Sequence, residues 1–294
     1  MSTVTARPRR SALYMPGSKP RALEKARGLP ADCLILDLED AVPPAEKESA
    51  RQTVVAALAE GGYGGREVVV RINGLDTPWG ADDLAAAASA GPDAILVPKV
   101  ESAAMIAKIE AGMGAAPETT RIWAMMETPL GMLNAAQIAS SSPRLGCLVM
   151  GTNDLIKELG AAHTETRLPV ITSLGLCMLA ARAHGLAILD GVYNAFRDED
   201  GLRAACLQAL EMGFDGKTLI HPAKLAPTNE VFAPSSEDID LAERQVAAFA
   251  EVEASGQAVA VVDGRIVENL HVETARALLA RAAAIAALEA ETAA

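Results

Sequence analysis

The chain has 294 residues, 50% of them hydrophobic and only 3% aromatic, and its formal net charge is −12. This length and apolar content allow one large domain with a core built mainly of small and aliphatic side chains. The negative charge argues against nucleic acid as a bulk partner. The four cysteines form no C-x-x-C motif and lie in apolar segments, which predicts buried, reduced thiols in a cytoplasmic protein. The N-terminal arginines are not followed by the apolar run of about 7 to 15 residues that a signal peptide needs, and no segment reaches the roughly 18 uninterrupted apolar residues of a membrane span.

Eight short apolar runs have the length and composition of buried parallel strands. They are residues 11–15, 33–38, 68–72, 94–99, 121–126, 147–150, 187–190 and 216–220. Alanine-rich segments of helical length separate them. Eight strand–helix repeats favour an α/β fold of the closed (β/α)8 TIM-barrel type, and the alternative is a doubly wound open sheet. The dinucleotide-binding form of that alternative is disfavoured because no G-x-G-x-x-G motif opens a helix after a strand.

The sequence changes character after the eighth strand, so we expect a barrel domain over residues 1–226 and a small appendage over residues 227–294. Residues 227–236 have the composition of a linker, and a helical pattern follows over residues 237–254. Two short apolar runs then flank Asp263-Gly264, which predicts a β-hairpin. By spacing alone Asp263 is a turn residue. A last helix from about Val272 completes a helix-hairpin-helix appendage that packs on its own barrel or on a neighbour's.

Residues that directly follow the strands of a barrel share one face, which carries the active site in barrel enzymes. Asp37, Glu39, Glu127 and Asp154 all lie at such strand ends, together with Arg71. A buried acid is costly unless a cation satisfies it. Glu127 and Asp154 follow adjacent strands and therefore predict a site for a hard divalent cation with oxygen ligands. The alternative is two unrelated acids in separate salt bridges.

A second feature is a basic cluster near the N-terminus, formed by Arg7, Arg9, Arg10, Lys19, Arg21, Lys25 and Arg27. A positive patch beside a cleft can hold phosphate groups, and the G-S-K-P turn before a helix adds a helix N-terminus that attracts anions. By charge alone the cluster is equally well a solvated basic face. The residue pattern leaves both interpretations open.

A Schiff-base aldolase is a rival enzyme class, with Lys99 or Lys217 as the nucleophile. A nucleophilic lysine needs a lowered pKa. The acids expected around Lys99 would raise its pKa instead, so an ion pair with a strand-end acid is the favoured role for this side chain.

Several long motifs, taken in order, resemble the citrate lyase beta-subunit-like family, which includes malyl-CoA lyases, citramalyl-CoA lyases and malyl-CoA thioesterases. The motifs are R-S-A-L-Y-M-P-G-S, L-I-L-D-L-E-D-A-V, V-V-R-I-N-G-L-D-T, I-L-V-P-K-V, M-M-E-T-P-L-G, V-M-G-T-N-D-L and K-T-L-I-H-P. The resemblance covers nearly the whole chain. The segments D-G-V-Y-N-A-F and V-V-D-G-R-I-V-E-N-L-H are most similar to the (3S)-malyl-CoA thioesterase group.

The resemblance implies a TIM barrel with Mg²⁺ held by Glu127 and Asp154. It implies that Arg71 holds the acyl oxygen where negative charge develops, and that Asp37 and Glu39 orient metal-bound waters or Arg71.

The resemblance also implies a coenzyme A thioester as the substrate, with its phosphates bound by Arg10, Lys19 and Lys25. In this family the aspartate of the V-V-D-G motif, here Asp263, acts from a neighbouring subunit. We therefore expect a homotrimer or a dimer of trimers.

The resemblance favours Mg²⁺-dependent hydrolysis of (3S)-malyl-CoA to malate and coenzyme A as the activity. The same residue types suit a lyase that cleaves the carbon–carbon bond of malyl-CoA or citramalyl-CoA to acetyl-CoA and a 2-oxo acid. A non-enzymatic alternative is a subunit of a complex of the citrate lyase type.

Overall fold

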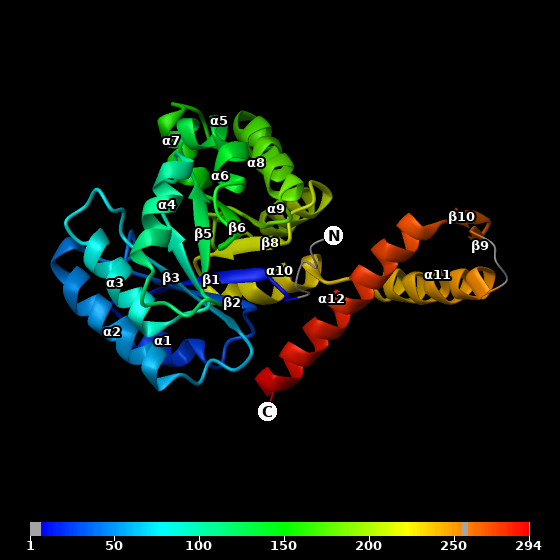
Figure 1. Ribbon diagram of the computed structural model, residues 1–294, viewed down its shortest axis with the longest axis horizontal. Coiled ribbons are helices and arrows are strands. Elements are labelled where there is room, and N and C mark those ends of the chain that lie inside the picture. Colours follow the sequence, from blue (N-terminus) through cyan, green and yellow to red (C-terminus); the bar gives the residue numbers. More distant parts are fainter. Residues whose placement is uncertain (1–6, 255–257, 294) are drawn as a thin grey trace. The chain divides into compact units, whose positions relative to one another are not determined.

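The structure is a computed structural model that describes residues 7–254 and 258–293. It contains two compact units (Figure 1). One spans residues 9–232, and the other holds residues 233–254 and 258–293 with residues 7 and 8 at the start of the chain.

Eight strands in the first unit form a closed barrel, in chain order (Figure 1). They are β1 (Ser11–Pro16), β2 (Cys33–Asp37), β3 (Glu67–Arg71), β4 (Ala94–Val97), β5 (Arg121–Met126), β6 (Leu145–Met150), β7 (Ala187–Asp190) and β8 (Gly216–Leu219). All neighbouring strands are parallel, and β8 closes the barrel by pairing with β1. The (β/α)8 TIM-barrel prediction is confirmed, and the open doubly wound sheet is excluded.

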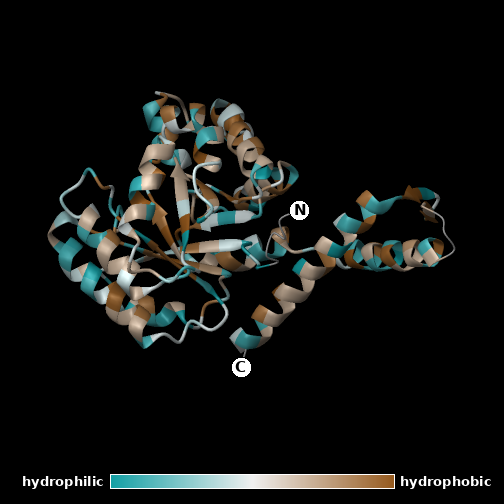
Figure 2. Ribbon diagram, viewed as in Figure 1, coloured by the Kyte–Doolittle hydropathy of each residue, from teal (hydrophilic) through white to brown (hydrophobic). Residues whose placement is uncertain are grey.

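Helices surround the barrel. They are α1 (Pro20–Ala26), α2 (Lys47–Glu60), α3 (Gly80–Ala90), α4 (Ala103–Gly112), α5 (Pro129–Leu133), α6 (Ala135–Ala139), α7 (Thr152–Glu158), α8 (Ile171–Ala183), α9 (Glu199–Glu211) and α10 (Leu225–Phe232). Short 3₁₀ turns precede three of them, at Pro44–Glu46, Leu168–Val170 and Pro222–Lys224. Hydrophilic and hydrophobic residues alternate along the outer helices (Figure 2), as expected for helices with one face on a core.

Side chains alternate across each strand, so the barrel has two apolar layers. Leu34, Leu36 and Val70 point outward and belong to the core beneath the helices. Ile35 and Val69 belong to a second cluster that fills the barrel itself. This strict alternation decides which strand residues can reach the interior and its open end.

A charged cluster at the amino ends of the strands closes the other end of the barrel. Arg9 precedes β1, and its Nε donates to Glu67 Oε2 at 2.6 Å. The guanidinium of Arg9 lies 5.7 Å from the ring centroid of Trp123, which is fully buried inside the barrel. Arg9 therefore belongs to the packing of the barrel floor.

The segment predicted as a linker, residues 227–236, is instead largely helical. Pro227 lies in the first turns of α10, and prolines are tolerated near a helix start. Phe232 is 1% exposed, Asn229 Nδ2 donates to Pro30 O at 2.7 Å, and α10 packs against α9, β1 and β8. The first compact unit therefore extends to Phe232, beyond the expected limit at residue 226, because α10 completes the wall of the barrel.

The second unit has its own small core. It contains α11 (Ser236–Ala254), α12 (Asn269–Ala293), and an antiparallel hairpin of β9 (Ala260–Val262) and β10 (Arg265–Val267). Phe249 of α11 packs with the inward residues of the hairpin. Asp263 and Gly264 form the turn with φ of 51° and 75°, so the predicted hairpin is present. Within residues 7–254 and 258–293, no helix is both long and apolar enough to cross a membrane.

A buried ion triad lies on the helix side of the barrel wall. Asp190, fully buried at the end of β7, accepts from Lys217 Nζ at 2.5 Å, and Arg167 Nη1 lies 2.7 Å from both of its oxygens. Burial alone would raise the pKa of Asp190, but Lys217 and Arg167 bring it below its ordinary value. The triad joins β7 to β8 and to the segment before α8.

Replacing Asp190 with alanine should strongly destabilise the barrel, because Lys217 would remain buried without its counter-charge. We expect a loss of about 3 to 5 kcal/mol in the free energy of unfolding, measured by urea denaturation. Glu230→Ala is the control, because it removes an exposed carboxylate from Arg203, which keeps a second partner in Glu199. Equal unfolding midpoints for the two variants would show that the triad does not stabilise the fold.

Candidate functional site

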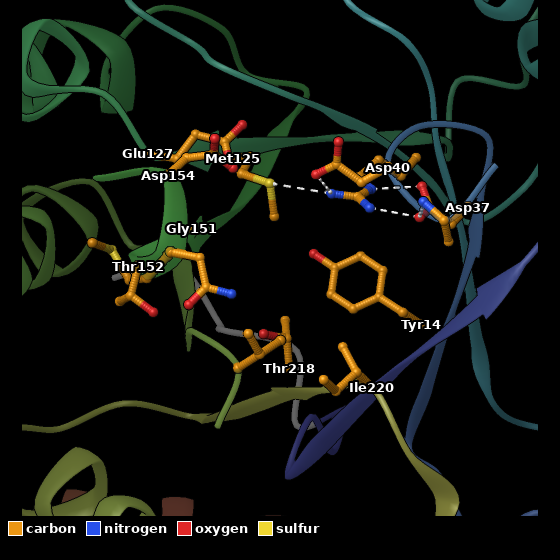
Figure 3. Close-up of a pocket in the computed structure, with 15 residues that line it drawn as sticks. Tyr14, Asp37, Asp40, Met125, Glu127, Gly151, Thr152, Asp154, Thr218 and Ile220 are labelled. Carbon is orange, nitrogen blue, oxygen red and sulfur yellow. Dashed lines mark hydrogen bonds and ion pairs between the residues drawn. The ribbon is translucent and has the colours of Figure 1, made fainter. Parts of the chain in front are cut away.

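A cavity of about 300 Å³ opens at the carboxyl ends of the strands (Figure 3). Its lining comes from the ends of β1, β2, β3, β5, β6 and β8, from the segments that follow them, and from the segment after β7. The lining residues include Tyr14, Asp37, Asp40, Arg71, Met125, Glu127, Gly151, Thr152, Asn153, Asp154, Thr218 and Ile220. Four of the candidate residues from the sequence, Asp37, Arg71, Glu127 and Asp154, therefore share one cavity.

Arg71 is the most constrained side chain of the cavity. Its Nε and Nη2 donate to the two oxygens of Asp37 at 2.6 and 2.5 Å, and its Nη1 lies 2.7 Å from Glu39 Oε2. The guanidinium stacks on the ring of Tyr14 at 4.6 Å, and Nη1 also faces Met125 Sδ at 3.9 Å. Burial would lower the pKa of Arg71, but Asp37 and the other contacts raise it well above its ordinary value. Arg71 is therefore a permanent cation in a fixed orientation.

The loop after β2 holds the acidic partners of Arg71. Asp37 accepts backbone N–H groups from Glu39 at 2.9 Å and Ala41 at 3.1 Å. Lys47, in the first turn of α2, donates to the carbonyl oxygens of Leu38 and Glu39 at 2.9 and 2.8 Å. Lys47 is only 6% exposed, so it is a buried anchor of this loop, which sequence reasoning did not identify.

Glu127 and Asp154 both line the cavity on the side across from Asp37 (Figure 3). Glu127 is 3% exposed, and its Oε1 accepts the backbone N–H of Lys99 at 2.8 Å. Burial is the main reason that the pKa of Glu127 rises to about 8, and the charges of Glu39 and Asp154 contribute. Asp154, in the first turn of α7, has Oδ1 3.5 Å from Lys99 Nζ.

Glycine is required at position 151 by this arrangement. A Cβ atom there would lie 2.4 Å from both Cβ and Oε2 of Glu127. The backbone N–H of Gly151 donates to Met126 O at 2.9 Å, which fixes the end of β6 against the end of β5. The G-T-N-D sequence thus brings Asp154 beside Glu127 without a side chain between the strands.

The two carboxylates fit a hard divalent cation. Mg²⁺ is commonly bound by one or two carboxylates, with waters and substrate oxygens completing the octahedron. In the described part of the chain no group of three or more histidine, cysteine or acidic residues forms a denser metal cluster, and no side-chain cation pairs directly with Glu127. A buried carboxylate without a contacting cation is the feature that a bound ion would satisfy.

The basic residues of the N-terminal cluster are not brought together. Lys19 follows β1 on the cavity side of the barrel and is exposed, with Nζ 3.5 Å from Glu46 Oε2. Lys25 is exposed in the last turn of α1.

Arg10 precedes β1 at the amino ends of the strands, is 4% exposed, and forms a bidentate pair with Asp32 at 2.9 Å. This position, buried on the face opposite the cavity, does not favour the phosphate-binding role implied for Arg10.

Asp263 lies in the second unit, at the turn of the hairpin. Both of its oxygens lie 2.8 Å from Nη1 of Arg244 in α11, and both side chains are exposed. The turn geometry expected from spacing is present, and the carboxylate is exposed while paired with Arg244.

The lysines of the aldolase alternative lack the required environment. Burial would lower the pKa of Lys99, but Asp154 and Glu127 raise it above its ordinary value. Lys217 lies on the helix side of the wall, where Asp190 holds it. Neither side chain is prepared for nucleophilic attack.

Tyr14 and Thr218 are cavity residues that sequence reasoning missed. A signal for both was available. Side chains alternate along a strand, so Tyr14 shares its orientation with inward-facing Ala12, and Thr218 pairs in register with Ala12.

A closed (β/α)8 barrel with a buried arginine, its carboxylate partners and a pair of acids around one cavity at the strand ends defines a TIM-barrel enzyme site. The family model described as HpcH/HpaI aldolase/citrate lyase matches residues 10–222, and the chain belongs to this family. The resemblance seen in the motifs is thereby confirmed.

Relatives of known name cover nearly the whole chain. The chain is 61% identical to a (3S)-malyl-CoA thioesterase of Cereibacter sphaeroides (strain KD131) over 97% of this chain and 98% of that protein. It is 36% identical to the citrate lyase subunit beta of Leuconostoc mesenteroides subsp. cremoris, covering 89% of each. Among solved structures, CitE from Mycobacterium tuberculosis in complex with magnesium, acetoacetate and coenzyme A is 30% identical, with a TM-score of 0.75 over 93% of this chain and 97% of that chain.

Gly151→Ala should weaken binding of Mg²⁺ by at least about tenfold, because the new methyl group displaces the Glu127 carboxylate. Calorimetric titration with Mg²⁺ measures the affinity directly. Gly175→Ala is the control, since a Cβ atom at Gly175 within α8 meets nothing within 4 Å. If both variants bind Mg²⁺ as tightly as the unmodified protein, Glu127 is not a ligand of the ion.

Proposed function

We propose that this protein is a Mg²⁺-dependent thioesterase that hydrolyses (3S)-malyl-CoA to malate and coenzyme A. The observation that carries the proposal is the 61% identity to a (3S)-malyl-CoA thioesterase over 97% of the chain. The cavity supplies the residue types that this chemistry requires, and it is large enough for the acyl group of a small dicarboxylic thioester.

Arg71 is the electrophilic group in this proposal. Addition of water to a thioester places negative charge on the carbonyl oxygen, and a permanent, pre-oriented cation stabilises that charge. Asp37 and Glu39 hold the guanidinium in place by the contacts described above. They act through Arg71 and are positioning residues.

Glu127 and Asp154 are the proposed ligands of Mg²⁺. When bound, the ion would supply a Lewis acid that orients the hydroxyl and distal carboxylate of the malyl group. A related protein, CitE, was crystallised with magnesium, acetoacetate and coenzyme A, which supports a magnesium site in this fold. Lys99, beside Asp154, balances part of the negative charge.

Lys19 and Lys25 are the proposed contacts for the phosphates of coenzyme A. Both are exposed, and Lys19 lies at the cavity end of β1, just before the N-terminus of α1. Arg10 is not part of this group, because its side chain is buried against Asp32 at the amino ends of the strands.

Asp263 is the proposed base, acting from a neighbouring subunit of a homotrimer or dimer of trimers. Its place at the exposed tip of a hairpin suits a residue that reaches into another subunit's site. As a base it would take a proton from the attacking water. The water oxygen bonds to the carbonyl carbon and the C–S bond breaks. The products are the malate carboxylate, the free thiol and one proton.

Cleavage of the carbon–carbon bond is the second candidate activity. The match to a family described as aldolase/citrate lyase favours it. Breaking that bond leaves an enolate on the same thioester oxygen, so Arg71 would serve either reaction. The products separate the two, because only hydrolysis releases a thiol.

The deciding measurement follows free thiol and glyoxylate together after (3S)-malyl-CoA is mixed with the enzyme and Mg²⁺. We expect thiol without glyoxylate. Glu127→Gln and Asp154→Asn should each lower turnover by at least about 100-fold, because each removes a charged ligand of the ion. Glyoxylate without thiol would replace the thioesterase with a lyase, and the absence of both products would favour a non-enzymatic subunit.

A complementation experiment tests the role of Asp263 across subunits. Glu127→Gln and Asp263→Asn should each be inactive alone. Co-expressed, they should restore about one quarter of the wild-type activity, because that fraction of randomly mixed sites combines an intact barrel with an intact neighbouring hairpin. Size-exclusion chromatography confirms that mixed oligomers form. Full activity of Asp263→Asn alone would make this residue a plain turn residue, and inactive mixed oligomers would place its action within its own chain.

A further inference from the structure

The hydroxyl group of Tyr14 has no role in the fold. Tyr14 lies on β1 and lines the cavity, and its Oη atom is buried without a hydrogen-bond partner. The side chain points its hydroxyl toward the middle of the cavity, away from Asp37 (Figure 3). Buried polar groups are normally paired, and one that is left unpaired at a site commonly awaits a ligand.

The ring of Tyr14 is fixed, so the hydroxyl has a defined position. Arg71 stacks on one face of the ring at 4.6 Å. Ala12 and Ile35 are fully buried members of the cluster inside the barrel that Tyr14 packs against. A donor held in this way costs little reorganisation when a ligand arrives.

Arg71 has few donors left for a substrate. A guanidinium has five N–H groups. Asp37 takes one from Nε and one from Nη2, and Glu39 takes one from Nη1, while the other Nη1 group faces the weak acceptor Met125 Sδ. One N–H group on Nη2 therefore remains without a described acceptor. An oxyanion readily accepts two or more hydrogen bonds, so a second donor is needed.

Two other neutral polar side chains of the cavity, Thr218 and Asn153, are already engaged. Thr218 donates its hydroxyl to Asp190 O at 3.1 Å. The side-chain amides of Asn153 and Asn194 bind each other through contacts at 3.2 and 2.8 Å. Tyr14 thus stands out as a rigid neutral donor next to Arg71.

We infer that Tyr14 Oη donates a hydrogen bond to the thioester carbonyl oxygen of the bound substrate, beside Arg71, and so forms the second half of the oxyanion site. This inference rests on the proposed function and adds a catalytic residue to it. The hydroxyl keeps its proton during the reaction, because burial raises the pKa of Tyr14 well above its ordinary value. It therefore donates a hydrogen bond and transfers no proton.

Tyr14→Phe tests the inference, because it removes the hydroxyl and keeps the ring beneath Arg71. We expect kcat on (3S)-malyl-CoA to fall by about 100-fold, as for loss of one oxyanion donor, with KM changed by less than about threefold. The affinity for Mg²⁺, measured by calorimetry, should stay unchanged. A merely structural role would instead alter stability and the affinity for Mg²⁺.

Tyr63→Phe is a closely matched control. The hydroxyl of Tyr63 is also buried without a hydrogen-bond partner, and the ring of Tyr63 also stacks with an arginine, Arg27, at 5.5 Å. Tyr63 lies before β3, at the amino ends of the strands, so this variant should keep the wild-type kcat.

A kcat for Tyr14→Phe within about twofold of an active wild type would overturn the role of Tyr14 and leave the proposed function intact. If the wild type releases glyoxylate in place of thiol, the same comparison is made on glyoxylate, since the charge develops on the same oxygen. A wild type without either product overturns the proposed function and this inference with it.

Discussion

The ion pair between Arg71 and Asp37 is the interaction on which the cavity depends. Asp37 ends β2 and Arg71 ends β3, and the register of these two parallel strands pairs the two residues directly. Both side chains point toward the interior of the barrel. Separately, each would be a costly buried charge, and together they form a bidentate pair. The pair fixes the guanidinium, the guanidinium fixes the ring of Tyr14, and the loop that carries Glu39 closes the cluster.

The cavity is built from backbone as much as from side chains. Glu127 is held by the N–H group of Lys99, and the loop after β2 is held by backbone groups that bind Asp37 and Lys47. Such contacts tie Glu127 to the segment after β4 and Asp37 to its own loop, so each acid has a fixed position. A barrel offers this advantage for chemistry, since the functional groups sit on the ends of packed strands.

Sequence pattern predicted the barrel because eight apolar runs with helical spacers have few other solutions. The strand-end rule likewise predicted Glu127, Asp154 and Arg71. The role of Arg10 came from the family resemblance instead, and the structure does not favour it, because a basic cluster in sequence says nothing about which end of β1 each residue occupies. The helix α10 was missed because prolines and asparagine suggest a linker, whereas contact with the barrel wall overrides that local preference.

Lys99 shows how the site constrains the sequence around it. Its φ of 49° places a residue with a side chain in the left-handed region, where glycine is at no disadvantage. Glycine would relieve that backbone cost and still offer its N–H group to Glu127. It would also remove the ammonium group beside Asp154. The backbone conformation at position 99 therefore favours glycine, whereas the contact with Asp154 requires a lysine. The lysine is present in a strained conformation, and this one residue contacts both acids.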